Sequence, residues 1–219
     1  MLDPATVIRN LSSLLDEETR SLLDHPGKLL LCGSHESVFL KAVQRKAAAF
    51  GIVCDFTPNI NPPYQGAIVD KETASPDIRL SADVDIDHSF TPGMSAVSQA
   101  VLTLLFALNL VGGKNITVVG RGHAVQGLAE WLIANDATVT VAHSKTKELW
   151  DAVRDRDVVV YATPSLRQKI TYGTRDLVID LGSCFPFPEL LDCPYVNKIG
   201  QLTVSILLNR FAKNGGNNG

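Results

Sequence analysis

The segment ITVVGRGHAVQG, residues 116–127, decides the expected fold. An apolar strand runs into Gly120-x-Gly122 and then directly into an amphipathic helix, which we predict over 124–135. A dinucleotide-binding fingerprint has this order, because its first glycine allows a tight turn and its second lets a pyrophosphate approach the backbone. The N-terminus of the helix would favour that anion. Val125 stands at the third glycine position, so a generic strand–turn–helix corner is the alternative.

The end of the next predicted strand, 137–142, bears on the choice of dinucleotide. In such folds the second strand ends beside the adenosine ribose, where an acidic residue binds the diol of NAD and a basic or hydroxyl residue favours the extra phosphate of NADP. Ser144, Lys145 and Arg121 supply a hydroxyl and two cations, and no acid. The pattern therefore favours NADP over NAD, with a solvated surface turn as the alternative.

Strand-like and helix-like segments alternate along the chain, which is typical of βαβ units and parallel sheet. The predicted strands are 28–32, 52–56, 66–69, 115–119, 137–142, 158–162 and 177–181, and the predicted helices are 3–24, 36–50, 91–110, 124–135, 146–154 and 200–213. We expect an α/β protein of two domains with a cleft between them. Residues 1–92 would form a smaller N-terminal α/β domain, to which the helix 200–213 returns, and residues 93–199 a Rossmann-like NAD(P)-binding domain.

Composition excludes several functional classes. The chain has 219 residues, 45% of them apolar, and a formal net charge of −3. It can bury a sizeable core, and it makes no electrostatic case for binding nucleic acid or an anionic membrane. The longest apolar-rich stretch, 96–111, is too short and too polar to span a membrane. The first residues show no secretory signal, which predicts a cytoplasmic protein.

The cysteines are predicted to be structural residues rather than reactive or metal-binding ones. Cys32, Cys54, Cys184 and Cys193 lack metal-site spacing, so we expect no bound metal. Three of them lie in or beside apolar runs, which is typical of buried, reduced thiols in a cytosolic protein. Cys184 follows the last predicted strand, where a reactive thiol is the less favoured alternative to a packed one.

Five ordered stretches resemble a known family. They are Val118-Val119-Gly120-Arg121-Gly122, the segment VTVAHSKTKEL (139–149), VIDLG (178–182), ADVD (82–85) followed by Phe90-Thr91-Pro92, and GQLTV (200–204). Together they resemble the bifunctional methylenetetrahydrofolate dehydrogenase/cyclohydrolase family. The matches occur in the family's order and run from about residue 29 to residue 212.

The resemblance implies a set of site residues, a homodimer and a small-molecule substrate, a folate or related one-carbon carrier. The implied contacts to NADP come from Thr91, Gly120, Arg121, Gly122, His123, Val125, His143, Ser144, Lys145, Thr163, Ser183, Gly200 and Thr203. Asp85 matches the family aspartate that hydrogen-bonds the pterin ring, and we assign it as the catalytic and substrate-binding carboxylate. A carboxylate can accept from two N–H donors at once. A carboxylate that caps its own loop is the alternative.

The substrate half departs from the family pattern. The family carries Tyr-x-x-x-Lys on the first helix of this half, and its lysine drives the cyclohydrolase step. Counting back from the end of the predicted helix 36–50 puts Phe39 and Val43 at these positions, and counting forward from its start puts Lys41 and Arg45 there. We favour the first register, since Val43 then fits the apolar face. Phe39 and Val43 would then line the substrate site, without a group that transfers protons.

Three alternative functions are consistent with these sequence features. The first is an NADP-dependent methylenetetrahydrofolate dehydrogenase without cyclohydrolase activity, because hydride transfer needs mainly positioning. The second is an NADP-dependent oxidoreductase acting on another imine or one-carbon adduct, motivated by the charged cluster Asp70-Lys71-Glu72. The third is a non-catalytic nucleotide- or partner-binding module. His88 lies near Asp85 in the sequence and could relay a proton, although a loop histidine that caps local backbone is the favoured interpretation.

Overall fold

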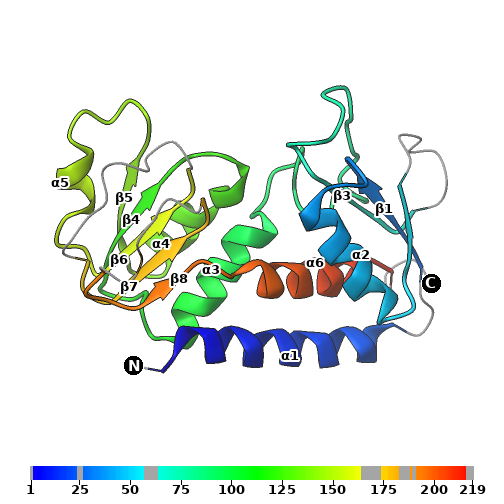
Figure 1. Cartoon of the computed structure of the whole chain (residues 1–219), viewed down its shortest axis with the longest axis horizontal. Helices are drawn as coiled ribbons and strands as arrows, with labels where there is room; N and C mark the ends of the chain where they lie inside the picture. Colours follow the sequence, from blue (N-terminus) through cyan, green and yellow to red (C-terminus); the bar gives the residue numbers. More distant parts are fainter. Residues whose placement is uncertain are drawn as a thin grey trace. The chain divides into compact units, whose positions relative to one another are not determined.

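The computed structural model describes residues 2–23, 27–56, 64–163, 174–182, 188 and 191–215 (Figure 1). The chain is an α/β protein with two parallel sheets, as predicted. It divides into two compact units, one formed by Met1–Asn10 and Val97–Gln201 and the other by Leu11–Ala96 and Leu202–Gly219. We refer to them as the five-stranded and the three-stranded unit.

The five-stranded unit is built around a fully parallel sheet in the order β5-β4-β6-β7-β8. Its elements are α3 (Ala96–Ala107), β4 (Asn115–Val119), a 3₁₀ turn (His123–Val125), α4 (Leu128–Ala134), β5 (Thr138–Ala142), α5 (Leu149–Val153), β6 (Val158–Tyr161), β7 (Leu177–Asp180) and β8 (Tyr195–Val196). The strands β6 and β7 are buried along their whole length, which is why they read as continuous apolar runs in the sequence.

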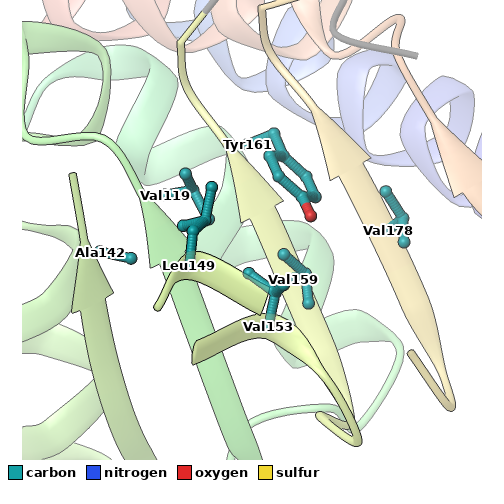
Figure 2. Packing of buried hydrophobic residues seen from close by; sticks show 7 residues of the cluster. All are labelled: Val119, Ala142, Leu149, Val153, Val159, Tyr161 and Val178. Atoms are coloured by element: carbon teal, nitrogen blue, oxygen red, sulfur yellow. The ribbon is translucent and has the colours of Figure 1, made fainter. Parts of the chain in front are cut away.

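The short helix α5 covers one face of this sheet. Leu149 and Val153 point from α5 onto strand residues that include Val119, Val159 and Tyr161 (Figure 2). All five side chains are buried, so the cluster is a closed apolar layer beneath the carboxyl ends of the strands. Burial of each aliphatic side chain contributes about 1.5–3 kcal/mol, which fixes the strand ends that carry the candidate site.

The three-stranded unit contains a second parallel sheet in the order β2-β1-β3. Its elements are α1 (Pro4–Leu22), β1 (Lys28–Cys32), α2 (Val38–Ala48), β2 (Val53–Asp55), β3 (Gly66–Val69) and α6 (Gly200–Gly215), with α1, α3 and α6 each continuing into the other unit. The hydroxyl oxygen of Ser37 caps α2 by accepting the Leu40 N–H at 3.1 Å, and Gly51 ends the helical segment with a left-handed φ of 73°.

A charged side chain links three helices of the three-stranded unit. The Lys46 ammonium on α2 lies 2.9 Å from the Asp16 carboxylate of α1. It also donates to the hydroxyl of Ser205 on α6. Both charged side chains are about one-fifth exposed, so this ion pair fixes how α1 and α6 lie against α2.

The structure confirms the predicted strands and most helices. The helix predicted over 91–110 begins only at Ala96, and the helix predicted over 146–154 begins only at Leu149. The predicted helix 124–135 is wrong in its first turn, because residues 123–125 form a 3₁₀ turn and α4 begins only at Leu128. Gly127, with a left-handed φ of 77°, separates the two. The sequence analysis also missed β8, a strand of two residues that pairs with β7. The predicted loop around 57–63 lies outside the described residues. None of the described helices is long and apolar enough to cross a membrane.

Replacing Gly182 by alanine should destabilise the protein. A Cβ there would lie 2.8–3.0 Å from the backbone atoms of Thr163, so the ends of β6 and β7 would have to separate. Overpacking of this kind costs about 2 kcal/mol, which we expect as a loss of unfolding free energy in urea denaturation. Gly122→Ala is the control, since its Cβ would meet nothing within 4 Å. Equal stability of the two variants would refute the close approach.

Candidate functional site

The carboxyl end of β4 is the topological switch point of the five-stranded sheet. The strand β4 lies between β5 and β6, so the chain moves from β4 to one side and then crosses back to the other side. Ligands of open parallel sheets bind at such a point. Gly120 follows β4 here with a φ of +128°, and its N–H donates to the Ala142 carbonyl at 2.8 Å. A Cβ on Gly120 would lie 3.1 Å from Ala162. Glycine is therefore required by geometry at this turn.

Gly122 provides room beside the turn. Its backbone is extended, with φ −78° and ψ 179°, and an added Cβ would meet no atom within 4 Å. The chain then enters the 3₁₀ turn, where His123 pairs through Nδ1 with Gln126 Oε1 at 3.0 Å and Val125 is buried. Close approach of a ligand to the backbone is thus possible at Gly122, although no α-helix begins directly behind it.

The turn after β5 is closed by its own side chains. The Thr146 hydroxyl accepts the His143 N–H at 2.9 Å, and the His143 Nδ1 accepts the Lys145 N–H at 3.1 Å. These bonds leave the side chains of Ser144 and Lys145 exposed, as is that of Arg121 after β4. No carboxylate occurs in residues 142–147. The strand ends β4 and β5, which are neighbours in the sheet, therefore carry exposed positive charge and a hydroxyl.

The remaining predicted cofactor residues are dispersed. Thr163 follows β6, and its backbone packs against Gly182. Gly200 begins α6, and Thr203, one turn later, is buried. Ser183 lies outside the described residues. Thr91, which the resemblance also assigned to the cofactor, belongs to the three-stranded unit and contacts Asp85 there.

Asp85 is buried within its own loop. Its side chain is 2% exposed, and its backbone forms an isolated parallel bridge with Ala67. The carboxylate accepts the N–H groups of Ser89, Phe90 and Thr91 at 2.8–3.0 Å and the Thr91 hydroxyl at 3.0 Å. In this structure Asp85 therefore acts as the organising group of the loop 85–91, and its assignment as a substrate ligand stays a prediction.

Charged side chains surround this loop on both sides. The Arg210 guanidinium of α6 donates to the carbonyls of Ile86 and Met94 at 2.9 Å each, and burial lowers the pKa of this arginine while the nearby Asp87 opposes that effect. On the outer side Lys71 lies 5.2 Å from the centre of the Phe90 ring. The cluster Asp70-Lys71-Glu72 lies in a turn. The Asp70 carboxylate accepts hydrogen bonds there from the Glu72 N–H and the Thr73 hydroxyl.

The helix α2 presents no ionisable group at the two predicted substrate positions. Val43 is fully buried and packs in the core of its unit, as the apolar pattern predicted, and Phe39 is half-buried. The buried Val43 side chain has no surface for a substrate to contact. The predicted role of Val43 as a substrate ligand is therefore not supported by its position, because contact would require the helix to move.

The sequence analysis missed a pocket at the carboxyl end of β1. Its volume is about 260 Å³, and its lining includes Cys32, the stacked rings of His35 and Phe56, and Thr73. Burial raises the pKa of the Cys32 thiol to about 11, so this cysteine is a wall residue rather than a nucleophile. Among the described residues no group of three or more His, Cys, Asp or Glu side chains could hold a metal ion.

The five-stranded unit matches a known family. Residues 95–184 match the NAD(P)-binding domain of tetrahydrofolate dehydrogenase/cyclohydrolase. The bifunctional protein FolD of Clostridium beijerinckii is 32% identical over 127 residues, which cover 50% of this chain and 45% of that protein. The chain spans about half the length of the curated relatives that it matches first.

Two solved structures share the fold over the whole chain. The methylenetetrahydrofolate dehydrogenase/cyclohydrolase of Campylobacter jejuni has a TM-score of 0.78 at 19% identity and covers 100% of this chain and 99% of its own. The enzyme of Trypanosoma brucei, solved with NADP and an inhibitor, has a TM-score of 0.73 at 22% identity and covers 98% and 97%.

The raised thiol pKa values predict slow alkylation at two sites. Burial raises the pKa of Cys32 to about 11, and burial together with the adjacent Asp55 raises that of Cys54 to about 11. At pH 8 the thiolate fraction of each is then about 100-fold below that of an ordinary thiol. Mass-spectrometric mapping of iodoacetamide labelling should find both unlabelled in native protein and labelled in urea. Labelling rates should rise only as the pH approaches 11.

Replacing Asp85 by alanine should destabilise the three-stranded unit. The substitution leaves three buried or half-buried backbone N–H groups without their acceptor, at a cost of about 3 kcal/mol in unfolding free energy. Asp83→Ala is the control, since Asp83 is two positions away and exposed. Urea denaturation of both variants provides the measurement. A stability of Asp85→Ala as high as that of Asp83→Ala would contradict the loop-organising role.

Proposed function

We propose that the chain, whose residues 95–184 match the NAD(P)-binding domain of tetrahydrofolate dehydrogenase/cyclohydrolase, is an NADP-dependent oxidoreductase acting on a folate one-carbon unit, as a methylenetetrahydrofolate dehydrogenase does. One observation carries the proposal. The glycine turn with its open face at Gly122 lies at the switch point of a fully parallel sheet, within the stretch that matches the family's NAD(P)-binding domain. This is where a dinucleotide binds in such sheets.

The residues of the turn fit a dinucleotide. Gly122 would let the pyrophosphate lie against the backbone, and Gly120 fixes the path of the chain beneath it. When bound, the nicotinamide ring supplies the hydride acceptor. The carbon that reacts lies between two nitrogens whose lone pairs stabilise the cation left by hydride loss. The protein's task is then to hold two reactants in contact, which can itself account for much of the rate.

We propose NADP rather than NAD as the physiological cofactor. Exposed Arg121 and Lys145, with the Ser144 hydroxyl, provide two cations and a donor for a phosphate, while residues 142–147 lack the carboxylate that would bind a free ribose diol. Ser144 and Lys145 belong to the turn that the hydrogen bonds of His143 and Thr146 close. The Lys145 cation is thus carried by a turn with its own hydrogen bonds.

We propose that the cyclohydrolase step is lost. Ring-opening hydrolysis needs a group that transfers protons, and Val43 on α2 is a buried aliphatic side chain at the position where we place the family lysine. We also propose that the protein forms the homodimer that the resemblance implies.

A second candidate function keeps the cofactor and changes the substrate to another imine or one-carbon adduct. The observation that favours it is the cationic surface near the Asp85 loop, where Lys71 and Arg79 both lie against the half-exposed ring of Phe90. A non-catalytic nucleotide-binding module is the remaining alternative. Turnover measurements separate the three.

Cofactor titration tests the proposal first. Isothermal titration should show binding of NADP, with NAD weaker by at least about tenfold, or 1.4 kcal/mol. Lys145→Ala should weaken NADP about tenfold and leave NAD unchanged, because only NADP carries the additional phosphate. Gly122→Ala should fold normally and yet weaken both nucleotides, since its methyl group would occupy the approach to the backbone. Absence of any nucleotide binding would refute both enzyme functions.

Turnover tests the substrate. Methylenetetrahydrofolate with NADP should give NADPH, followed by absorbance, without accelerated hydrolysis of the methenyl product. NADP binding without folate turnover would favour the second candidate function. Accelerated methenyl hydrolysis would contradict our interpretation of Val43. Boiled protein and Gly122→Ala serve as controls for non-enzymatic conversion.

A further inference from the structure

A pocket of about 230 Å³ in the five-stranded unit shares no residue with the glycine turn. It is lined by the start of α1, the end of β8 with the residues that follow it, and the first turn of α6. All of these residues fall within Met1–Asn10 and Val97–Gln201. The whole pocket is therefore built by one unit.

The inner wall of this pocket is apolar and fixed in place. Ile8 and Val196 are buried. The Tyr195 ring, which also lines the pocket, packs against the cluster of Figure 2, and its hydroxyl donates to the Asp180 carboxylate at 2.8 Å. A preformed apolar wall of this kind suits the nonpolar part of a ligand.

The rim of the pocket carries positive charge. Arg9, Asn197 and Lys198 line it and are exposed, and none of the described lining residues is acidic. Within the described part of the chain the Lys198 ammonium has no ion pair and the Asn197 amide has no hydrogen bond. An ammonium has three N–H donors and an amide has two, so the rim holds unused donors as well as charge.

The guanidinium of Arg9 is held at one end only. It donates to the Thr6 hydroxyl at 2.9 Å, which uses one of its five N–H donors. The Asp3 carboxylate beyond Thr6 accepts the Thr6 N–H at 2.9 Å and the Thr6 hydroxyl at 2.7 Å. These two bonds lower the Asp3 pKa more than the charge of Arg9 does. Asp3 thus serves the start of α1, and Arg9 keeps donors for a ligand.

We propose that this pocket binds a small phosphate monoester, whose phosphate lies against Arg9 and Lys198 and whose nonpolar group packs on Ile8 and Tyr195. Two cations without an acid match a dianion better than a single carboxylate. The planar guanidinium fits two phosphate oxygens at once, and the ammonium acts as a point charge. Pockets for larger ligands span about 300–1,000 Å³, so this one excludes a dinucleotide. The site is independent of the proposed nucleotide function.

Phenyl phosphate is a suitable probe, followed by amide shifts in ¹⁵N-labelled protein. The largest shifts should fall on Asn197, Lys198 and Ile199. Arg9→Ala and Lys198→Ala should each weaken binding about tenfold, and both residues are exposed, so the variants should fold normally. Arg154→Ala is the matched control, because it removes an exposed cation of the same unit that does not line the pocket.

Three further probes test the two halves of the ligand. Inorganic phosphate lacks the nonpolar group, benzoate carries a single charge, and benzyl alcohol carries none. We expect the first two to bind at least about tenfold more weakly than phenyl phosphate, and benzyl alcohol to cause no shifts. Benzoate binding as tightly as phenyl phosphate would overturn the assignment of a dianion. Inorganic phosphate binding as tightly would overturn the role of the apolar wall.

The position of the shifts separates this site from the glycine turn. Phenyl phosphate that shifts only the amides of Gly122 and Lys145 would overturn the proposal, because the phosphate would then occupy the proposed cofactor site. Equal affinities of Lys198→Ala, Arg9→Ala and Arg154→Ala would do the same. Failure of the protein to bind NADP would refute the proposed function and leave the shifts at Asn197 and Lys198 as expected.

Discussion

The position of β4 between β5 and β6 is the constraint on which the five-stranded unit depends. A parallel sheet must be covered on both faces, so the chain leaves β4 in one direction toward β5 and returns to β6 on the other side. The turn after β4 must then pass close to both neighbours. Gly120 meets this demand by donating to Ala142 on one side and approaching Ala162 on the other. The exposed face at Gly122 is a consequence of that path.

The elements of the five-stranded unit could be predicted from the sequence where burial is complete. Strands such as β6 read as apolar runs because both faces are covered. The start of α4 could not be predicted, because Gly127 acts as a left-handed N-cap, whereas an amphipathic pattern continues through it. The strand β8 was missed because its two residues pair only through tertiary proximity to β7. Local periodicity contains no signal for such a pair.

The loop 85–91 shows why site residues are harder to predict than strands. The sequence left Asp85 with two interpretations, and only the positions of its four donors show how much of its capacity the loop uses. All four donors come from residues within six positions. The motif alone could not reveal them, since a carboxylate near a Ser-Phe-Thr stretch can face inward or outward. Whether the carboxylate faces inward depends on its burial, and burial depends on the packing of the whole three-stranded unit.

The Asp85 carboxylate uses its hydrogen-bonding capacity mainly within its own loop. A carboxylate that must satisfy three backbone N–H groups cannot also serve a ligand at full strength, because each oxygen has a limited number of lone-pair directions. Its effect on its surroundings is then exerted through the groups that it orders. In this loop those groups are Thr91 and, through its hydroxyl, His88. The conformation of the loop 85–91 thus depends on a hydrogen-bond chain that starts at the buried Asp85 carboxylate.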